Sequence, residues 1–399
     1  MAGRPETTGP VVNYQGQPYE PAPIDATLLH AMTLPTGTSP YGSARELLHG
    51  IAQEVNRFSA LPERFVSEVS WTALSTWFLD VTASAPSLSI LGSETIAGNQ
   101  LFRLLGALCR RALTLSAARF TGVCSLLTGW QPTLLIRHAH FDRDVERVLS
   151  AARKPGEYVP LSGRLVELHS AVVTLSELDG ARLPPQAVLR IPILQTQSPV
   201  VKLEQDIVEK IEADFQPRLL AYRRENHAKV QHSPFDAPML DDLVRELACC
   251  LGACTPDGDL QAELLKVLQP RNTEYLSAKS TDFNAVVVEA LLFYSHERSG
   301  GKVYVGEVAE TVQTILAGRG EPIEVTPHSV GHALDDLGLQ RELRRKKGYP
   351  VVLTLSVRRR IHGLARQIRA LPFADGIERC ELCRSDGPTH DLAAAETRA

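Results

Sequence analysis

The chain has 399 residues, of which 44% are apolar and 22% are charged; these values are ordinary for a soluble globular protein of two or three domains. Its net charge of -4 is small. Its apolar stretches are far shorter than the roughly 18 residues of a membrane helix, and its first residues lack the apolar core of a secretory signal, so we expect a cytoplasmic protein with no membrane partner.

The seven cysteines are an odd number in a long chain, which argues against a disulfide framework. Cys380 and Cys383 form a CxxC pair, which supplies half of a zinc site, and the sequence contains no second pair. His390 is a candidate third ligand, but it lies in a tail that we expect to be disordered. We therefore predict no metal site and interpret the pair as reduced thiols.

The N-terminal segment, residues 1–42, is rich in Pro, Gly and Thr and shows no periodicity, so we expect a disordered arm. Two helical patterns follow. In the first, apolar residues recur at helical spacing from Leu47 to Phe58. Pro62 then interrupts the pattern, and a second helix is expected over residues 64–80.

The segment 43–199 is predicted to fold as an α/β domain, because short apolar strands alternate with helices. The candidate strands are Leu88–Leu91, Leu113–Ser116, Thr133–Arg137, Ala171–Leu175 and Val188–Ile193. Helices are expected over Asn99–Arg111 and Phe141–Arg153. Such a pattern favours a largely parallel sheet, which binds ligands at the carboxyl ends of its strands.

The loop Gly92–Gly98 follows the first strand and precedes a helix, which is the layout of a phosphate-binding P-loop. That motif ends in Gly-Lys-Ser/Thr. Here the corresponding residues are Gly98, Asn99 and Gln100, so the lysine and the magnesium-binding hydroxyl are both replaced. Only the backbone contribution, which begins at Ser93, remains.

A second polar position follows the strand Thr133–Arg137. P-loop ATPases carry Asp-Glu at such a strand end, where the Asp holds magnesium and the Glu activates water. Arg137 and His138 stand there instead, so we predict no catalytic residues. Arg137 could contact a phosphate directly, or it could be a polar residue that merely ends a strand.

Residues 200–300 show repeated helical periodicity and are predicted to form a helical domain. Residues 301–371 read as helix, helix, hairpin and helix, the order of a winged helix-turn-helix. In this unit Thr326 caps a helix that begins at Pro327, the hairpin joins 339–343 to 351–355, and the last helix begins at Val357. Residues 372–399 are expected to be a disordered tail.

Positive charge is concentrated near the C-terminus. Between Arg341 and Arg369 there are ten basic residues and one acidic residue, a net charge of +9, which leaves -13 for the rest of the chain. This asymmetry indicates a polyanion partner. The candidate DNA-binding residues are Arg344, Arg345, Lys346, Lys347, Arg358, Arg359 and Arg360. The presumed recognition helix lacks Arg, Asn and Gln, so we expect contacts with the phosphate backbone.

Residues 43–195 resemble the P-loop ATPase module of phage- and plasmid-borne primase–helicase proteins. The resemblance rests on Ser93–Gln100, on Pro132–His138, and on a strand from Ala171 that leads towards Pro184. It implies that Arg190 matches the arginine that recognises the terminal phosphate. The C-terminal unit is similar to winged helices at the ends of such proteins. Residual nucleotide contacts would then involve Ser93, Gly98, Asn99, Gln100, Arg137 and Arg190.

The leading hypothesis is therefore a degenerate P-loop ATPase-like protein, without a cofactor, that binds DNA as an accessory in DNA metabolism or mobile-element biology. One alternative is a weakly active ATPase that binds ATP, uses His138 as the base and has Arg190 completing the site. The other is a protein–protein adaptor in which the basic unit meets an acidic partner.

Overall fold

The computed structural model describes residues 12–14, 17–19, 26–117, 119–127, 131–137, 143–161, 163–177, 188–193, 201–298, 301–320, 324–367 and 380–384. The chain divides into two compact units, Met1–Pro270 and Arg271–Ala399. None of the helices in the described residues is both long enough and apolar enough to cross a bilayer.

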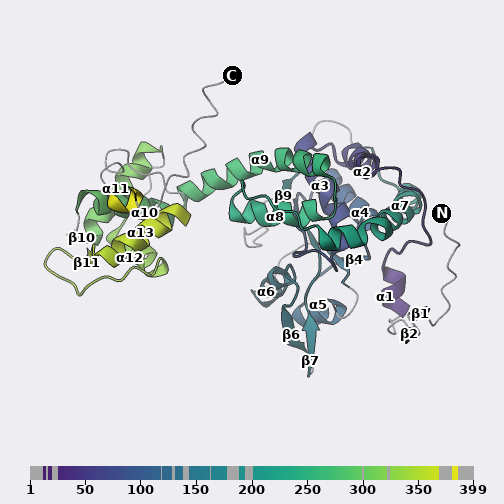
Figure 1. Ribbon diagram of the computed structural model, residues 1–399, viewed down its shortest axis with the longest axis horizontal. Coiled ribbons are helices and arrows are strands. Elements are labelled where there is room, and N and C mark those ends of the chain that lie inside the picture. The colour runs from purple at the N-terminus through teal and green to yellow at the C-terminus, as the bar shows by residue number, and fades with distance from the viewer. Residues whose placement is uncertain are drawn as a thin grey trace, which may run out of the picture. The chain divides into compact units, whose positions relative to one another are not determined.

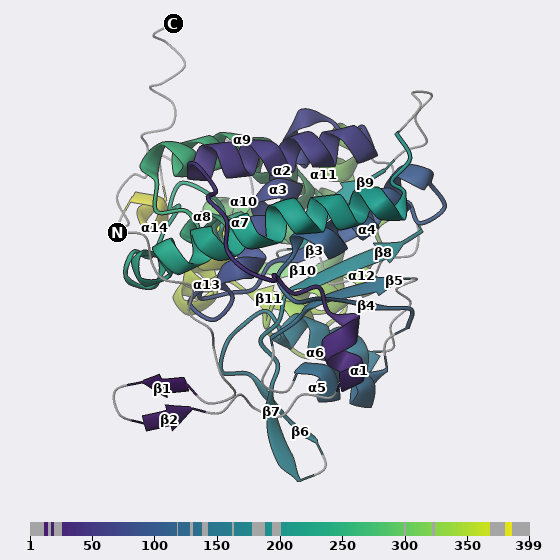
Figure 2. The ribbon, with the colours of Figure 1, turned by 90° about the vertical axis from the view of Figure 1, so that its right-hand side faces the viewer.

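The centre of the first unit is a five-stranded sheet in the order β4-β5-β8-β3-β9 (Figure 2). Its strands are β3 (Ser87–Leu91), β4 (Ala112–Leu115), β5 (Thr133–Arg137), β8 (Val172–Ser176) and β9 (Leu189–Pro192). Every neighbouring pair is parallel, which confirms the α/β sheet predicted from the sequence. The arrangement is consistent with a P-loop NTPase-like α/β domain.

Helices cover both faces of this sheet (Figure 2). One face carries α4, which packs against α2, α3 and α7, while α5 and α6 lie on the other. The bounds are α2 (Ala44–Ser59), α3 (Glu63–Ser75), a 3-10 turn (Thr76–Phe78), α4 (Ile96–Leu108), α5 (Phe120–Leu127), α6 (Arg143–Ala151), α7 (Gln205–His232) and α8 (Asp242–Ala253). A capping box between Ser43 and Glu46 fixes the start of α2.

Several elements of the first unit were not expected from the sequence. Helix α5 and the antiparallel hairpin of β6 (Tyr158–Leu161) and β7 (Arg164–Glu167) are additions to the predicted pattern. The N-terminal arm contains β1 (Val12–Tyr14), β2 (Gln17–Tyr19) and α1 (Ala26–Ala31). Part of it is folded onto the domain, because Met32 is buried in the core beneath α5 and α6 and forms a β-bridge with Leu113.

The second unit is built around α10 (Phe283–Glu297), whose apolar residues lie in one core with α11, α12 and α13 (Figure 1). Its other elements are β10 (Lys302–Tyr304), α11 (Val305–Gly318), α12 (Pro327–Asp336), β11 (Pro350–Val352), α13 (Leu355–Gln367) and α14 (Glu381–Arg384). Helix α9 (Gly258–Thr281) contains the boundary between the units. The expected helical domain over 200–300 is thus shared: α7 and α8 belong to the first unit and α10 to the second.

The second unit also corrects two local predictions. Strand β11 pairs with β10, and the residues 339–343 that were expected as its hairpin partner are not a strand. The reason is apolar burial, since Val303 and Val351 are paired and fully buried. Helix α13 begins at Leu355 rather than Val357. The predicted N-cap Thr326 is confirmed: its hydroxyl accepts a hydrogen bond from the Ser329 N–H, and Pro327 is the first helical residue.

Candidate functional site

The junction between β3 and α4 is a tight turn of four residues, Gly92–Thr95. The Thr95 N–H donates to the Gly92 carbonyl at 3.0 Å, and the Thr95 hydroxyl accepts from the Gly98 N–H at 2.9 Å. Helix α4 therefore begins at Ile96, three residues before the predicted start at Asn99, because Thr95 acts as its N-cap. The loop predicted over Gly92–Gly98 is correspondingly shorter, and Gly98 lies in the first helical turn.

Backbone donors of this turn are already bonded within the protein. The N–H groups of Gly92 and Ser93 both donate to the Ser176 carbonyl at the end of β8, at 2.8 and 2.9 Å. Gly92 adopts a φ of +138°, which only glycine tolerates well. Glu94 is exposed on the same turn and adds a negative charge where a phosphate would approach. Three of the four N–H groups of the turn, those of Gly92, Ser93 and Thr95, are thus bonded within the protein, and we call this arrangement the closed turn.

Position 98 requires glycine because the backbone of the turn passes very close to it. A Cβ on Gly98 would lie 2.3 Å from the Gly92 carbonyl oxygen. We expect Gly98→Ala to lower the free energy of unfolding of the first unit by about 1–3 kcal/mol, measured by urea denaturation. Gly106→Ala on the same helix is the control, since its nearest neighbour would be a Leu135 methyl at 3.9 Å and no loss is expected. Equal effects of the two substitutions would contradict the closed turn.

Asn99 and Gln100, in place of the motif's lysine and hydroxyl, serve the fold. The Asn99 amide donates to the carbonyls of Ser93 at 2.6 Å and Thr95 at 2.9 Å. Gln100 is buried; it donates to the Phe58 carbonyl at 3.1 Å and accepts from the Leu203 N–H at 2.6 Å. Gln100 thus holds together segments of the first unit that are distant in sequence, whereas these Asn99 hydrogen bonds fix the local turn.

Arg137, at the end of β5, completes the same arrangement. Its guanidinium donates to Asn99 Oδ1 at 2.5 Å and lies over the Phe102 ring, 5.0 Å from the centroid. The two replaced motif positions, Asn99 and Arg137, are therefore direct partners. A cation held here occupies the region where a metal-binding carboxylate would stand in an active ATPase. His138 lies outside the described residues.

Arg190 is not brought to this place. Arg137 is in register with Leu175, which is in register with Ile90 and, through it, with Ile191. Residues in register share a face of a sheet, and successive residues alternate. Arg190, which precedes Ile191, therefore lies on the face of α5 and α6, whereas Arg137 lies on the face of α4.

Two cavities of the first unit lie elsewhere. One of about 310 Å³ is lined by residues that include Arg153, Lys154 and Glu246. The other, of about 600 Å³, is lined by residues that include His49 and Trp71. Neither is lined by residues 92–100, so neither extends the candidate phosphate position.

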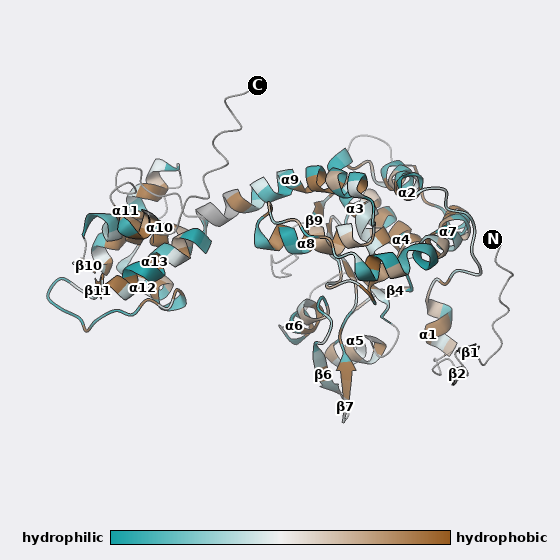
Figure 3. Cartoon of the chain, in the orientation of Figure 1, coloured by the Kyte–Doolittle hydropathy of each residue, from teal (hydrophilic) through white to brown (hydrophobic). Residues whose placement is uncertain are grey.

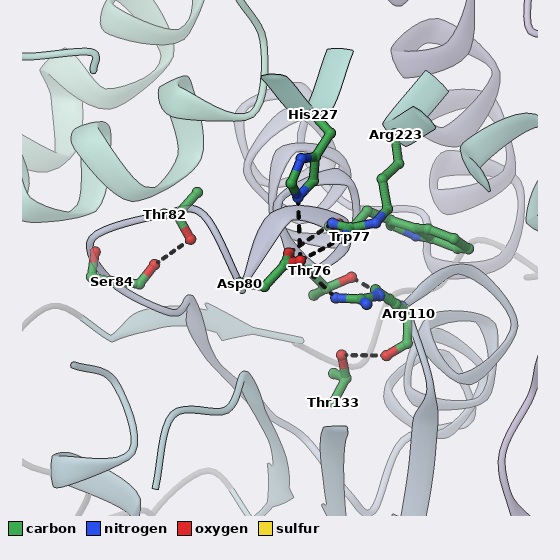
Figure 4. A network of polar contacts seen from close by, with 9 residues as sticks. All are labelled: Thr76, Trp77, Asp80, Thr82, Ser84, Arg110, Thr133, Arg223 and His227. Atoms are coloured by element: carbon green, nitrogen blue, oxygen red, sulfur yellow. Dashed lines mark hydrogen bonds and ion pairs between the residues drawn. The ribbon is translucent and has the colours of Figure 1, made fainter. Parts of the chain in front are cut away.

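A separate polar network lies at the amino ends of β4 and β5 (Figure 4). Asp80 accepts hydrogen bonds from both Arg223 amino groups at 2.8 and 2.5 Å and lies 3.6 Å from an Arg110 nitrogen. Burial opposes ionisation of Asp80, but the hydrogen bonds and charges of Arg223 and Arg110 outweigh it and hold its pKa well below the usual range. Since ligands of parallel sheets bind at the carboxyl ends, we interpret this network as structural.

The basic residues of the second unit fall into two groups. Arg344–Lys347 are exposed in the loop between α12 and β11, where Arg345 and Gly348 exchange backbone hydrogen bonds across a tight turn; Figure 3 shows this loop as largely hydrophilic. Arg359 is also exposed. In contrast, Arg358 donates to the Ser295 hydroxyl at 3.3 Å and Arg360 to the Leu337 carbonyl at 3.0 Å, so these two act partly within the unit.

A grouping in the second unit was missed by sequence reasoning. Cys380 and Cys383 lie against His296 and His362, and their four potential ligand atoms are all within 4.8 Å of one another. The histidines are 66 residues apart and belong to different helices, so no local sequence motif indicated that they would lie beside the two cysteines. His390, the ligand considered from the sequence, lies outside the described residues.

Comparison with known proteins gives little further guidance. No family model matches the chain, and no curated protein matches it. Similar solved structures include the SCCmec type IV Cch active helicase, with 10% identity, a TM-score of 0.38 and coverage of 81% of this chain and 72% of that one. The NrS-1 C-terminal region has 11% identity, a TM-score of 0.39 and coverage of 86% and 83%. Scores this low carry no conclusion about function.

Proposed function

We propose that this protein is a DNA-binding accessory protein in DNA metabolism or mobile-element biology, with a P-loop-like domain that does not hydrolyse ATP. The second unit would act as a winged helix, with the loop between α12 and β11 as its wing. The observation that carries the proposal is the exposed cationic turn Arg344–Lys347. DNA would be held chiefly through its phosphates.

Several features of the turn support phosphate binding. All four of its basic side chains are exposed, and Leu343 beside them is 89% exposed. Among the described residues, no carboxylate pairs with Arg344 or Lys346, whereas Arg345 lies 3.2 Å from Glu342. Unpaired cations on an exposed turn remain available to a polyanion, and each phosphate contact releases counterions.

Helix α12 is suited to lie near DNA without reading bases. Its polar residues include the exposed His328 and His332 and the half-buried Ser329, and Asp335 is paired with Arg341 at 2.5 Å. This pairing removes one of the two carboxylates that would repel a phosphate. The helix has no Arg, Asn or Gln for bidentate contacts with base edges, so binding would depend little on sequence.

The first unit supports the non-catalytic part of the proposal. Hydrolysis requires a charged group at the phosphates and ligands for magnesium. Asn99 and Gln100 are bonded within the fold, and Arg137 is bonded to Asn99. The domain would therefore contribute an assembly or interaction surface, and the partner it would contact there is a protein.

The proposal is tested by fluorescence anisotropy of the full chain with a labelled duplex at several salt concentrations. We expect the triple variant Arg344→Gln, Lys346→Gln, Lys347→Gln to bind at least about tenfold more weakly at about 50 mM salt. The slope of log affinity against log salt should fall by roughly 2–3, because about 0.9 is lost per phosphate contact.

The matched control removes three equally exposed charges from the first unit: Arg147→Gln, Lys202→Gln and Lys210→Gln, whose side chains are 79%, 78% and 76% exposed. It should leave the affinity nearly unchanged. Equal weakening by both triple variants, or no binding by the unaltered chain at low salt, would overturn the DNA proposal and favour a protein partner. DNA-stimulated ATP turnover with magnesium would favour the ATPase alternative.

A further inference from the structure

The second unit contains four side chains of the types that bind zinc, gathered at one place. They are His296 in the last turn of α10, His362 in α13, and Cys380 and Cys383, which flank the start of α14. His362 and Cys380 are 3% and 4% exposed, and the other two are half-buried. Three separate parts of the chain thus converge on one point.

The distances between the potential ligand atoms suit a single metal ion. The Nε2 atoms of the two histidines are 3.3 Å apart. The Cys380 sulfur lies 3.2 Å from His362 Nε2, and the Cys383 sulfur lies 3.4 Å from His296 Nε2. In a tetrahedral zinc site with bonds of about 2.0–2.3 Å, ligand atoms lie about 3.3–3.8 Å apart. Three of the six distances thus agree with such a site to within about 0.1 Å, and the remaining three, which are at most 4.8 Å, require shifts of no more than about 1 Å.

The surroundings orient one ligand in advance. His362 Nδ1 lies 2.7 Å from the Arg358 carbonyl and donates its proton there, which leaves the Nε2 lone pair directed at the cluster. A backbone carbonyl in this role is typical of histidines that bind zinc.

We propose that His296, His362, Cys380 and Cys383 form a structural Cys₂His₂ zinc site. Both thiols lose a proton on binding, so the reaction takes up one Zn²⁺ and releases two protons, without any redox step. Two thiolates cancel the charge of the ion, which suits a place that is largely buried. All four positions are filled by protein, as in a structural site, so no position is left for catalysis.

The site would fasten the segment Cys380–Arg384, expected from the sequence to be part of a disordered tail, to α10 and α13. Helix α14 already contacts α13 in the structure. The zinc site also adjoins Arg358, one of the candidate DNA-binding residues, through the His362 hydrogen bond. The proposal does not depend on DNA binding, because it follows from the ligand geometry alone.

The test is the zinc content of the full chain, purified under reducing conditions, loaded with zinc and dialysed against a weak chelator. We expect about one zinc per chain, as for a closed site with four protein ligands. Cys383→Ser should retain less than about a tenth of that zinc. Mutation of residues that only hydrogen-bond to metal ligands already lowers metal affinity about 10–100-fold, and loss of a ligand should cost at least as much. The control is Cys249→Ser, another half-buried cysteine outside the cluster, which should retain full zinc.

Cobalt substitution of the unaltered chain covers the case in which Cys383→Ser fails to fold. Bound Co²⁺ should show the visible bands of tetrahedral coordination and a sulfur-to-cobalt charge-transfer band, and zinc should displace it. His362→Gln should abolish both signals. Zinc content near zero in the unaltered chain, equal zinc in Cys383→Ser, a cobalt spectrum without the sulfur band, or a Cys380–Cys383 disulfide in the reduced preparation would each overturn the proposal.

Discussion

Replacing Asp80 with asparagine is expected to lower the free energy of unfolding of the first unit by about 2–3 kcal/mol at neutral pH. The carboxylate compensates two largely buried cations, since Arg110 and Arg223 side chains are 12% and 13% exposed. Burial and neighbouring arginines already lower the pKa of Arg110 to about 9. Without Asp80 both guanidinium groups would remain buried without a counter-charge. Because Asp80 itself is 32% exposed, we expect a loss at or below the lower end of the about 3–5 kcal/mol that is typical of broken buried pairs.

The pH dependence of this effect has a definite sign. The pKa of Asp80 is lower in the folded chain than in the unfolded chain. Its contribution to stability is therefore complete above the ordinary carboxyl pKa of about 4 and is lost as the pH falls further, towards the folded value. The difference between the unaltered chain and Asp80→Asn should be constant from neutral pH down to about pH 5 and should shrink below about pH 4.

Urea denaturation followed by tryptophan fluorescence measures this effect selectively. The three tryptophans of the chain, Trp71, Trp77 and Trp130, all belong to the first unit. The control is Asp206→Asn, which breaks an exposed pair with Lys210 at 3.0 Å and should cost less than about 0.5 kcal/mol. If Asp80→Asn lowers the unfolding free energy by no more than Asp206→Asn does, the Asp80 network does not stabilise the first unit.

The second large effect concerns the two replaced motif positions. Asn99→Lys would place an ammonium beside the Arg137 guanidinium and remove the two hydrogen bonds that the amide donates. We expect a loss of about 2–3 kcal/mol in the unfolding free energy of the first unit. In the double variant Asn99→Lys, Arg137→Asp, the new side chains attract each other, so its loss should be about 1–2 kcal/mol smaller than the sum of the single losses.

A matched cycle uses Arg190→Asp in place of Arg137→Asp. Both arginine-to-aspartate substitutions change the net charge by the same amount. The sheet register, however, places Arg190 on the face of the sheet opposite to Arg137. The coupling with Asn99→Lys should therefore be within about 0.5 kcal/mol of zero. Similar coupling for both arginines would mean that the change in net charge, rather than the Asn99–Arg137 contact, causes the effect. That result would also mean that the Asn99–Arg137 contact does not contribute to the stability of the first unit.

The sheet could be predicted from the sequence because its strands carry their own signal. The three central strands β3, β5 and β8 are short runs that are almost entirely buried, and Thr133–Arg137 was located to the residue. The cap at Thr326 with Pro327 was predictable for a similar reason, since its residues are adjacent in sequence. Asn99 and Arg137 were both singled out from the sequence as replaced motif positions, and in the structure they contact each other.

The start of α4 was missed although its cap is local: the Thr95 hydroxyl accepts a hydrogen bond from the Gly98 N–H, and Thr95 lies three residues before the glycine that the motif emphasises. Features that depend on tertiary contacts could not be predicted from the sequence. The side of the sheet occupied by Arg190 follows from the register of β9 with β3, which no local pattern specifies. The grouping of His296 and His362 with the CxxC pair requires the packing of α10 against α13.

The closed turn between β3 and α4 has a consequence for regulation. In nucleotide-driven machines, a ligand changes the state of a protein only when it binds one conformation better than another. Here the groups that would respond to a nucleotide already have partners within the fold: Gly92 and Ser93 with Ser176, and Asn99 with Arg137. Under the function proposed above, this domain would keep the same shape whether the cell is rich or poor in ATP, because it would not hydrolyse the nucleotide.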